Sequence, residues 1–174
     1  MTARPVLFLA CALYLTVSSF AAQAAPVKPR LDTPSGYPVP RFVSLKGERT
    51  NCRTGPSFSH PVRFVFQRAG APVLVIAESV DNWRKIRDPA GDECWAHRTT
   101  LKAQTKVLTL HRTILRTKPA PDAPSAAEIG SGVLMKLEKK RSDWLEVSVD
   151  GRRGWTRASE VWGGDALDAP AGRN

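Results

Sequence analysis

The chain contains one imperfect internal repeat. Four pairs of residues stand at matched positions in its two copies: Arg53 with Arg116, Gly70 with Gly132, Trp83 with Trp144, and Trp95 with Trp155. Their separation falls in single steps from 63 to 60 residues, as loop shortening within one duplicated unit would produce. A period near 60 is longer than most solenoid repeats and fits one small domain. The repeat therefore predicts two similar modules, an organisation that favours binding over catalysis.

Residues 1–24 have the pattern of a secretory signal peptide. Arg4 supplies a positive start, residues 6–17 are mostly apolar, and Ala22-Gln23-Ala24 is a small-x-small cleavage sequence. The alternative is a membrane anchor, but the apolar run is shorter than the roughly 20 residues that span a bilayer. We expect cleavage between Ala24 and Ala25, export to the periplasm or beyond the cell, and no stable membrane span in the mature chain.

The chain is strongly basic, with a formal net charge of +10 that becomes +9 when residues 1–24 are removed. Such a charge ordinarily indicates nucleic acid as the partner. Export argues against nucleic acid, because the anions outside the inner membrane are cell-wall polymers, anionic lipids and lipopolysaccharide. We therefore expect no nucleic-acid partner. The alternative interpretation is that the charge only keeps two small domains soluble.

The expected mature chain has two cysteines, Cys52 and Cys94, and both lie in the first repeat. The second repeat has Leu115 and Gly154 at the matching positions, so the cysteines are present together and absent together. Two cysteines in an exported protein predict a disulfide. The alternative is that one of them is a nucleophile.

An enzyme has little support in the sequence. A cysteine peptidase or amidase would use Cys52 or Cys94 with His60 or His97 as the base, but no motif places the Asp or Asn that would orient the base. The chain has no Gly-rich phosphate loop, no H-E-x-x-H, no G-x-S-x-G and no metal-ligand spacing. We expect a protein that is not an enzyme and has no cofactor and no metal.

The two ends of the mature chain differ from its middle. Residues 25–41 contain five prolines and are expected to form a semi-rigid linker, and residues 163–174 a flexible tail. Between them, strands are predicted at residues 73–77, 83–87 and 94–96 of the first repeat and 133–137, 144–149 and 154–156 of the second. The pair Asp150-Gly151 predicts a tight hairpin. With no long helical stripe, the fold class is all-β, in the form of small barrels or sandwiches.

Several of these residues together resemble the bacterial SH3-like domain, in the tandem form of exported proteobacterial proteins. The resemblance is carried by Thr50-Asn51-Cys52-Arg53-Thr54-Gly55-Pro56, by Gly70 before an apolar strand, by Asp81-Asn82-Trp83, and by a Trp near the end of each copy. It covers a first domain at residues 42–104 and a second, degenerate domain at 105–162. The second domain departs from the pattern at Leu115 and at Lys118, which replaces the glycine. The resemblance implies a barrel of five or six strands per domain.

The resemblance also implies that the protein binds cell-wall material, namely peptidoglycan, or an envelope protein. A structural adaptor is a further alternative, and the sequence leaves the oligomeric state undetermined. Outward-facing positions of the first domain are expected to form a basic, aromatic-edged groove for carboxylates. The candidate groove residues are Asn51, Arg53, Trp83, Arg84, Arg87, His97 and Arg98. The alternative is that Trp83 belongs to the core and that the arginines are ordinary surface residues.

Overall fold

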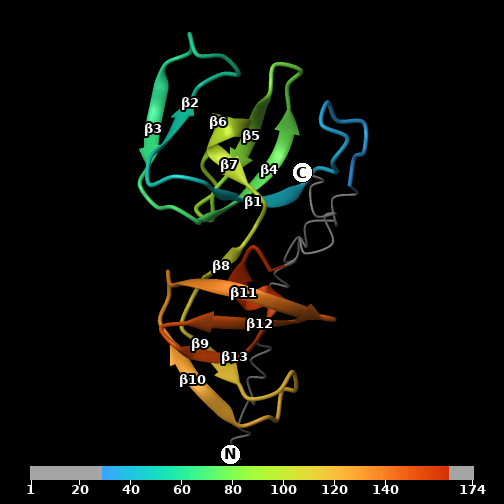
Figure 1. Ribbon diagram of the computed structural model, residues 1–174, viewed down its shortest axis with the longest axis vertical. Coiled ribbons are helices and arrows are strands. Elements are labelled where there is room, and N and C mark those ends of the chain that lie inside the picture. The colour runs from blue at the N-terminus through green and yellow to red at the C-terminus, as the bar shows by residue number, and fades with distance from the viewer. Residues whose placement is uncertain (1–28, 165–174) are drawn as a thin grey trace, which may run out of the picture.

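The computed structural model describes residues 29–164, so the predicted signal peptide, its cleavage site and most of the predicted tail lie outside the described residues. The described chain forms two β domains that are stacked along the long axis of the molecule (Figure 1). It contains fourteen strands and two short 3₁₀ segments, and no α-helix within residues 29–164. No helix in this part of the chain has the length and apolar character needed to cross a membrane.

The first domain is a seven-stranded antiparallel sheet in the order β3-β2-β6-β5-β4-β1-β7. Its strands are β1 (Arg41–Leu45), β2 (Thr50–Arg53), β3 (Val62–Phe66), β4 (Pro72–Glu78), β5 (Trp83–Arg87), β6 (Glu93–His97) and β7 (Leu101–Lys102). The 3₁₀ segment η1 (Arg98–Thr100) turns the chain back, so that Leu101 pairs with Leu45 of β1.

The second domain repeats this arrangement strand for strand, in the order β10-β9-β13-β12-β11-β8-β14. Its elements are β8 (Lys106–Thr109), β9 (Thr113–Arg116), β10 (Ser125–Ile129), β11 (Leu134–Arg141), β12 (Trp144–Val149), β13 (Arg152–Arg157), η2 (Ala158–Glu160) and β14 (Val161–Trp162). The all-β class and the duplication are thus confirmed. Each sheet has seven strands where five or six were expected, because a two-residue strand after each 3₁₀ segment also pairs.

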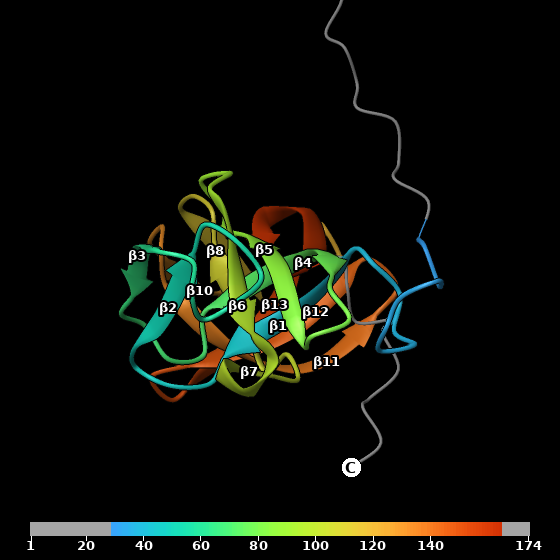
Figure 2. The ribbon, with the colours of Figure 1, turned by 90° about the horizontal axis from the view of Figure 1, so that it is seen from above.

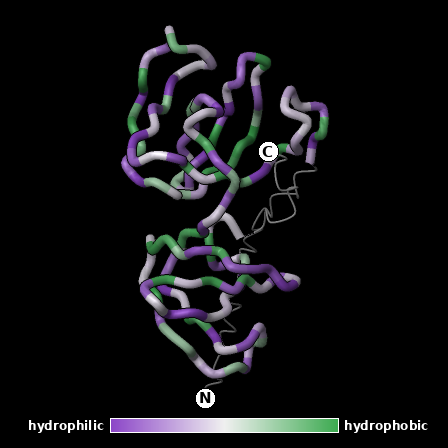
Figure 3. The backbone as a smooth tube through the Cα atoms, viewed as in Figure 1, coloured by the Kyte–Doolittle hydropathy of each residue, from purple (hydrophilic) through white to green (hydrophobic). Residues whose placement is uncertain are grey.

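The predicted hairpin at Asp150-Gly151 is present between β12 and β13. Both residues have positive φ values, 48° and 75°, as a two-residue turn of the favoured hairpin type requires. Along the strands, hydrophobic and hydrophilic residues alternate, as Figure 3 shows for both domains. This alternation turns one face of each sheet toward a core and the other toward solvent.

Each domain has its own core, and both cores are aliphatic. The buried first-domain cluster consists of Val39, Leu45, Cys52, Val73, Val75, Ile86, Cys94 and Ala96. The second consists of Val107, Leu115, Ile129, Met135, Leu145, Val147, Ala158 and Val161. Neither cluster contains a tryptophan, although Trp83, Trp144 and Trp155 are also buried, with exposed fractions of 3%, 7% and 8%. They lie on the opposite side of the strands.

The predicted disulfide joins Cys52 on β2 to Cys94 on β6, with Cα atoms 5.4 Å apart. Both residues are buried within the first core, with exposed fractions of 0% and 3%. The bond therefore links strands that are 42 residues apart in the chain.

The described part of the Pro-rich segment packs against the first domain, although a linker was expected there. Arg30 and Val39 form a β-bridge, with backbone hydrogen bonds of 2.8 and 3.0 Å in the two directions. Val39 is buried in the first core, and Ser35 contacts Glu78 of β4. The segment also turns at residues 33–36, where the Gly36 backbone nitrogen donates to the carbonyl oxygen of Thr33 at 2.9 Å, and proline content could not predict which surface it would contact.

The two domains touch through side chains as well as through the connecting chain. Trp162 of β14 donates a hydrogen bond from its indole nitrogen to the carbonyl oxygen of Pro72, at 3.0 Å, and packs edge-on against Phe42 with ring centroids 5.0 Å apart. Arg68 donates to the carbonyl oxygen of Gly132, at 2.8 Å. Figure 2 looks down the long axis of the molecule, so that one domain is seen in front of the other. This set of contacts is called the domain junction below.

Candidate binding faces

The outer side of strands β5 and β6 carries aromatic residues in the first domain. Trp83 lies directly across from His97, and Lys85 across from Trp95, so all four side chains are on the same side of the sheet. The rings of Trp83 and His97 have centroids 5.2 Å apart. Trp83 is nevertheless only 3% exposed, because a loop lies over it.

This loop, residues 54–61 between β2 and β3, supplies a residue that sequence reasoning missed. The ring of Phe58 lies 4.9 Å from that of Trp83 and 5.2 Å from that of His97, and Phe58 is still 68% exposed. The guanidinium of Arg53 lies 5.8 Å from the centre of the Phe58 ring and donates to the carbonyl oxygen of His60, at 2.7 Å. An aromatic residue in a Ser-rich loop between two strands was the available signal. We call Arg53, Phe58, Trp83 and His97 the first face.

The structure thus brings three of the predicted groove residues, Arg53, Trp83 and His97, together. Arg87 lies on the same outer side of β5, two residues beyond Lys85, but its guanidinium is bound to Glu93 at 2.6 Å. Lys85 contacts the same carboxylate at 2.6 Å, so one negative charge is shared by two cations at the border of the first face.

The remaining exposed candidates lie at the margin. Asn51 is exposed on β2, on the same side as Arg53 because the two are separated by one residue. Arg98 is exposed at the start of η1, where its backbone nitrogen donates to the carbonyl oxygen of Asn82, at 2.9 Å. Neither side chain contacts the aromatic cluster through any interaction found in the described residues.

The expectation that Arg84 faces outward is wrong. Ile86, two residues later on β5, is in the core, and strand alternation therefore turns Arg84 inward as well. Arg84 lies directly across from Glu78 of β4, and its Nε is 3.0 Å from the Glu78 carboxylate. Arg41 contacts the same carboxylate at 2.5 Å. Arg41, Glu78 and Arg84 form a buried triad, which is a structural feature of the first domain.

The triad is closed by the Pro-rich segment. Ser35 donates to the two carboxylate oxygens of Glu78 from its backbone nitrogen, at 3.0 Å, and its hydroxyl, at 2.8 Å. Burial acts to raise the pKa of Glu78, but the hydrogen bonds from Arg41 and Ser35 outweigh it, and the pKa lies below its ordinary value. Burial lowers the pKa of Arg84, and the charge of Glu78 opposes that shift.

The second domain presents the corresponding face with different residues. Trp144 lies across from Arg157, whose guanidinium sits 4.5 Å above the indole ring and is also paired with Asp143. The loop at 117–124 repeats the hydrogen bonds of the loop at 54–61. In particular, Arg116 donates to the carbonyl oxygen of Ala123, at 2.8 Å, as Arg53 does to that of His60.

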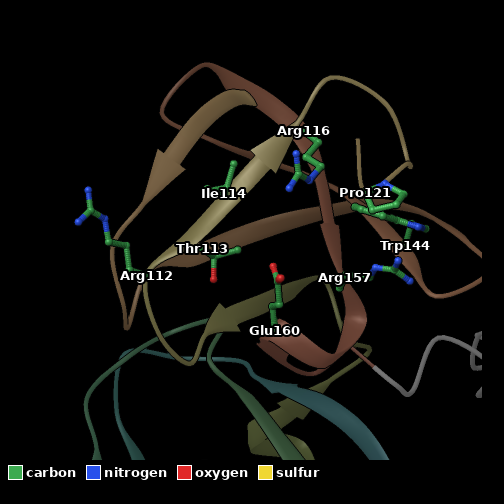
Figure 4. Close-up of a pocket in the computed structure, with 8 residues that line it drawn as sticks. All are labelled: Arg112, Thr113, Ile114, Arg116, Pro121, Trp144, Arg157 and Glu160. Carbon is green, nitrogen blue, oxygen red and sulfur yellow. The ribbon is translucent and has the colours of Figure 1, made fainter. Parts of the chain in front are cut away.

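Here the face opens into a pocket of about 290 Å³. It is lined by Arg112, Thr113, Ile114, Arg116, Pro121, Trp144, Arg157 and Glu160 (Figure 4). Pro121 occupies the loop position of Phe58. We call Arg116, Pro121, Trp144 and Arg157 the second face, and the cavity beside it the second-domain pocket.

The departure at Lys118 has a structural reason. In the first domain, a Cβ atom on Gly55 would lie 2.3 to 2.7 Å from atoms of the His60 ring. The second domain has Ala123 at the position of His60, so no ring occupies the space beside Lys118. The glycine and the histidine of the loop are therefore replaced as a pair.

Within residues 29–164, no three side chains of the metal-binding types are grouped closely enough to hold an ion. The described site thus consists of two related surfaces, each with an arginine held by its loop and a tryptophan on the outer side of the sheet. An arginine in such a position can form charge-assisted hydrogen bonds to an anionic group.

Comparison with known proteins places this architecture in a family. A model of the bacterial SH3 domain matches residues 46–102 and again residues 111–163, which together are more than half of the chain. The protein therefore belongs to the bacterial SH3 domain family and carries two consecutive copies of the domain. No curated protein matches the chain at a significant level.

Solved structures with some similarity include two Trichomonas vaginalis proteins, NlpC2 (8% identity, TM-score 0.33) and NlpC1 (8% identity, TM-score 0.36). Another is an NlpC/P60 family protein from Bacillus cereus ATCC 10987, with 13% identity and a TM-score of 0.32. The alignments cover 71%, 85% and 69% of this chain, and 48%, 50% and 55% of those chains. The chain thus spans about half the length of these proteins, and scores this low carry no argument about function.

Proposed function

We propose that the protein is an exported, non-enzymatic binding protein that recognises peptidoglycan through its two outer faces. The observation that carries this proposal is that each domain gathers a loop-held arginine and a tryptophan on one face. Arg53 and Trp83 both contact Phe58, and Arg116 and Trp144 both line the second-domain pocket. Arginine binds carboxylates through two parallel hydrogen bonds, and the exposed Phe58 ring, which rests on Trp83, can pack against a flat apolar surface or a cation. Cell-wall polymers offer both carboxylates and such surfaces. Membership of the bacterial SH3 domain family also supports a role in binding the cell wall.

The cysteines support a binding protein over a cysteine peptidase or amidase. Cys52 and Cys94 are bonded to each other, and both are buried in the core of the first domain. A nucleophile must be a free thiolate that a substrate can reach. His60 contacts Ser57 at 2.8 Å and His97 contacts Thr99 at 2.8 Å, so neither histidine is paired with a sulfur.

The proposal is tested by co-sedimentation of the mature protein with purified sacculi at low and high salt. We expect binding that weakens as salt rises, because the basic faces lose part of their attraction when charges are screened. The double variant Arg53→Ala/Phe58→Ala should bind less. Its matched control is Leu31→Ala/Lys102→Ala, which also removes one exposed apolar group and one exposed cation, away from both faces.

The proposal would be contradicted if the protein did not sediment at any salt concentration, or if the control variant lost as much binding as Arg53→Ala/Phe58→Ala. It would also be contradicted if a variant that combines Arg53→Ala/Phe58→Ala with Arg116→Ala/Pro121→Ala bound fully. Absence of sedimentation would favour an adaptor that holds other envelope proteins. Thermal melting of each variant separates loss of binding from loss of folding.

A further inference from the structure

The two faces differ in the residue that the loop places beside the tryptophan. In the first face, the Phe58 ring lies against Trp83 and His97 and fills the space beside the tryptophan. In the second face the smaller Pro121 stands at that position, and the second-domain pocket is open next to Trp144. The second domain, which matches the family pattern less well, therefore offers a cavity that a ligand can enter.

The second-domain pocket carries charges of both signs. Arg116 is held by the carbonyl oxygen of Ala123 and has no carboxylate partner among the contacts found in the described residues. Glu160, the last residue of η2, accepts a hydrogen bond from the Thr156 hydroxyl at 2.9 Å. Figure 4 shows Glu160 rising into the space below Ile114 and Arg116.

The acid is peculiar to this domain. The residue of the first domain that matches Glu160 is Thr100, the last residue of η1, whose hydroxyl donates to the carbonyl oxygen of His97, at 2.8 Å. The other two pocket arginines already have carboxylate partners outside the pocket, Arg112 with Glu128 and Arg157 with Asp143. This leaves Arg116 and Glu160 as the cation and the anion that a ligand can pair with.

We propose that the second-domain pocket binds a zwitterion the size of an amino acid or a dipeptide. Arg116 would bind the ligand carboxylate and Glu160 its ammonium group, while Trp144, Pro121 and Ile114 contact an apolar side chain. The pocket volume of about 290 Å³ lies just below the roughly 300 Å³ at which the usual range of ligand pockets begins, so it suits a small ligand. This inference rests on the proposed binding function and gives the ligand class for one of its two faces.

The first experiment follows the Trp144 indole N–H by NMR while the dipeptide alanyl-leucine is added to the mature protein. We expect a saturable shift of that signal, and weaker binding by roughly tenfold or more for both the N-acetylated and the C-amidated dipeptide, since each loses one charge-assisted contact. The absence of a saturable shift would overturn the proposal. Equal binding of either blocked form would also overturn it.

The second experiment repeats the titration with variants. Arg116→Lys keeps the charge but loses the two-pronged geometry, and Glu160→Gln keeps an acceptor for Thr156 but loses the charge. Both should bind alanyl-leucine at least about tenfold more weakly. The control Lys136→Gln, on the exposed side of β11, should bind as the wild type does. Unchanged binding in both pocket variants would overturn the assignment, and the NMR spectrum of each variant shows whether it has folded.

Comparison with sacculus sedimentation separates the two proposals. Sedimentation of the wild type without dipeptide binding would overturn the zwitterion pocket and leave the proposed function standing. Dipeptide binding at Trp144 without sedimentation would overturn peptidoglycan as the partner while supporting the pocket.

Discussion

A Cβ atom on Gly154 would lie 2.7 Å from the Cβ of Leu115, a distance that side chains do not tolerate. These two residues occupy in the second domain the positions that Cys52 and Cys94 occupy in the first. One domain thus joins β2 to β6 by a covalent bond, and the other joins β9 to β13 by close packing of a leucine on a glycine. The disulfide and the leucine–glycine contact should therefore respond differently to substitution.

Gly154→Ala should destabilise the second domain by about 1 to 3 kcal/mol, because the added methyl group meets Leu115 and also the carbonyl oxygen of Arg116, at 3.0 Å. Denaturant unfolding of the full protein measures the change. The control is Gly130→Ala in the same domain, where a Cβ would have no atom within 4 Å. Equal effects of the two substitutions would contradict this explanation.

Reduction of the disulfide should destabilise the first domain and leave the second domain nearly unchanged. The bond closes a loop of 42 residues, for which the chain-entropy model gives about 4 kcal/mol as an upper figure. Hydrogen exchange followed by mass spectrometry, with and without reductant, resolves the two domains. A thiol count on denatured, unreduced protein should find neither Cys52 nor Cys94 free, and two free thiols would refute the bond.

Arg84→Ala should cost much more stability than Arg87→Ala, although the two arginines are three residues apart on one strand. Arg84 is buried, and its removal leaves the Glu78 carboxylate with one guanidinium fewer, a loss in the range of about 3 to 5 kcal/mol for buried pairs. The Arg87 side chain is 43% exposed in its pair with Glu93, and such pairs contribute about 0 to 1 kcal/mol. Urea unfolding of both variants makes the comparison.

Stability should fall in acid partly through Glu78. The pKa of this carboxyl is lower in the folded protein than in the unfolded chain, so its contribution is complete above the unfolded value of about 4.3 and is lost as pH falls through the folded value. Glu78→Gln should therefore be less stable than the wild type near neutral pH. In melting experiments below pH 5, its stability should fall less steeply with decreasing pH than that of the wild type. Glu48→Gln, which removes an exposed carboxyl group outside the triad, serves as the control and should keep the wild-type slope.

Gly55→Ala should destabilise the first domain, and a second substitution, His60→Ala, should restore much of the loss. The added Cβ would otherwise lie within 2.7 Å of the imidazole. The double variant resembles the second domain, where Ala123 replaces the histidine and the larger Lys118 replaces the glycine. A double-mutant cycle by denaturant unfolding measures the coupling. Additive effects of the two substitutions would show that the ring can move aside without cost.

The sequence predicted the strands and their duplication because local patterns determine them. Matched anchors such as Trp83 and Trp144, and the Asp150-Gly151 turn with its positive φ values, depend on neighbours close in the chain. The disulfide could be predicted for a different reason: Cys52 and Cys94 are the two cysteines of the expected mature chain, and the second domain lacks both.

Other parts of the site depend on contacts between distant segments. Phe58 lies in a loop without periodicity, and only the folded chain shows that its ring covers Trp83. Arg84 could have been placed inside by counting two residues back from Ile86, but its partner Glu78 becomes apparent only when β4 and β5 are paired. Strand alternation was thus a usable signal for Arg84, whereas no local signal existed for the docking of Ser35 on Glu78.

The domain junction sets the distance between the two faces. Trp162 and Arg68 connect the domains through side chains as well as through the backbone, so the faces do not reorient as they would on a flexible tether. A second contact on the same ligand is then intramolecular, and it forms only when the ligand offers its groups at a matching separation. On a repetitive polymer, the paired domains would select ligands by the spacing between their binding groups as well as by the chemistry of those groups.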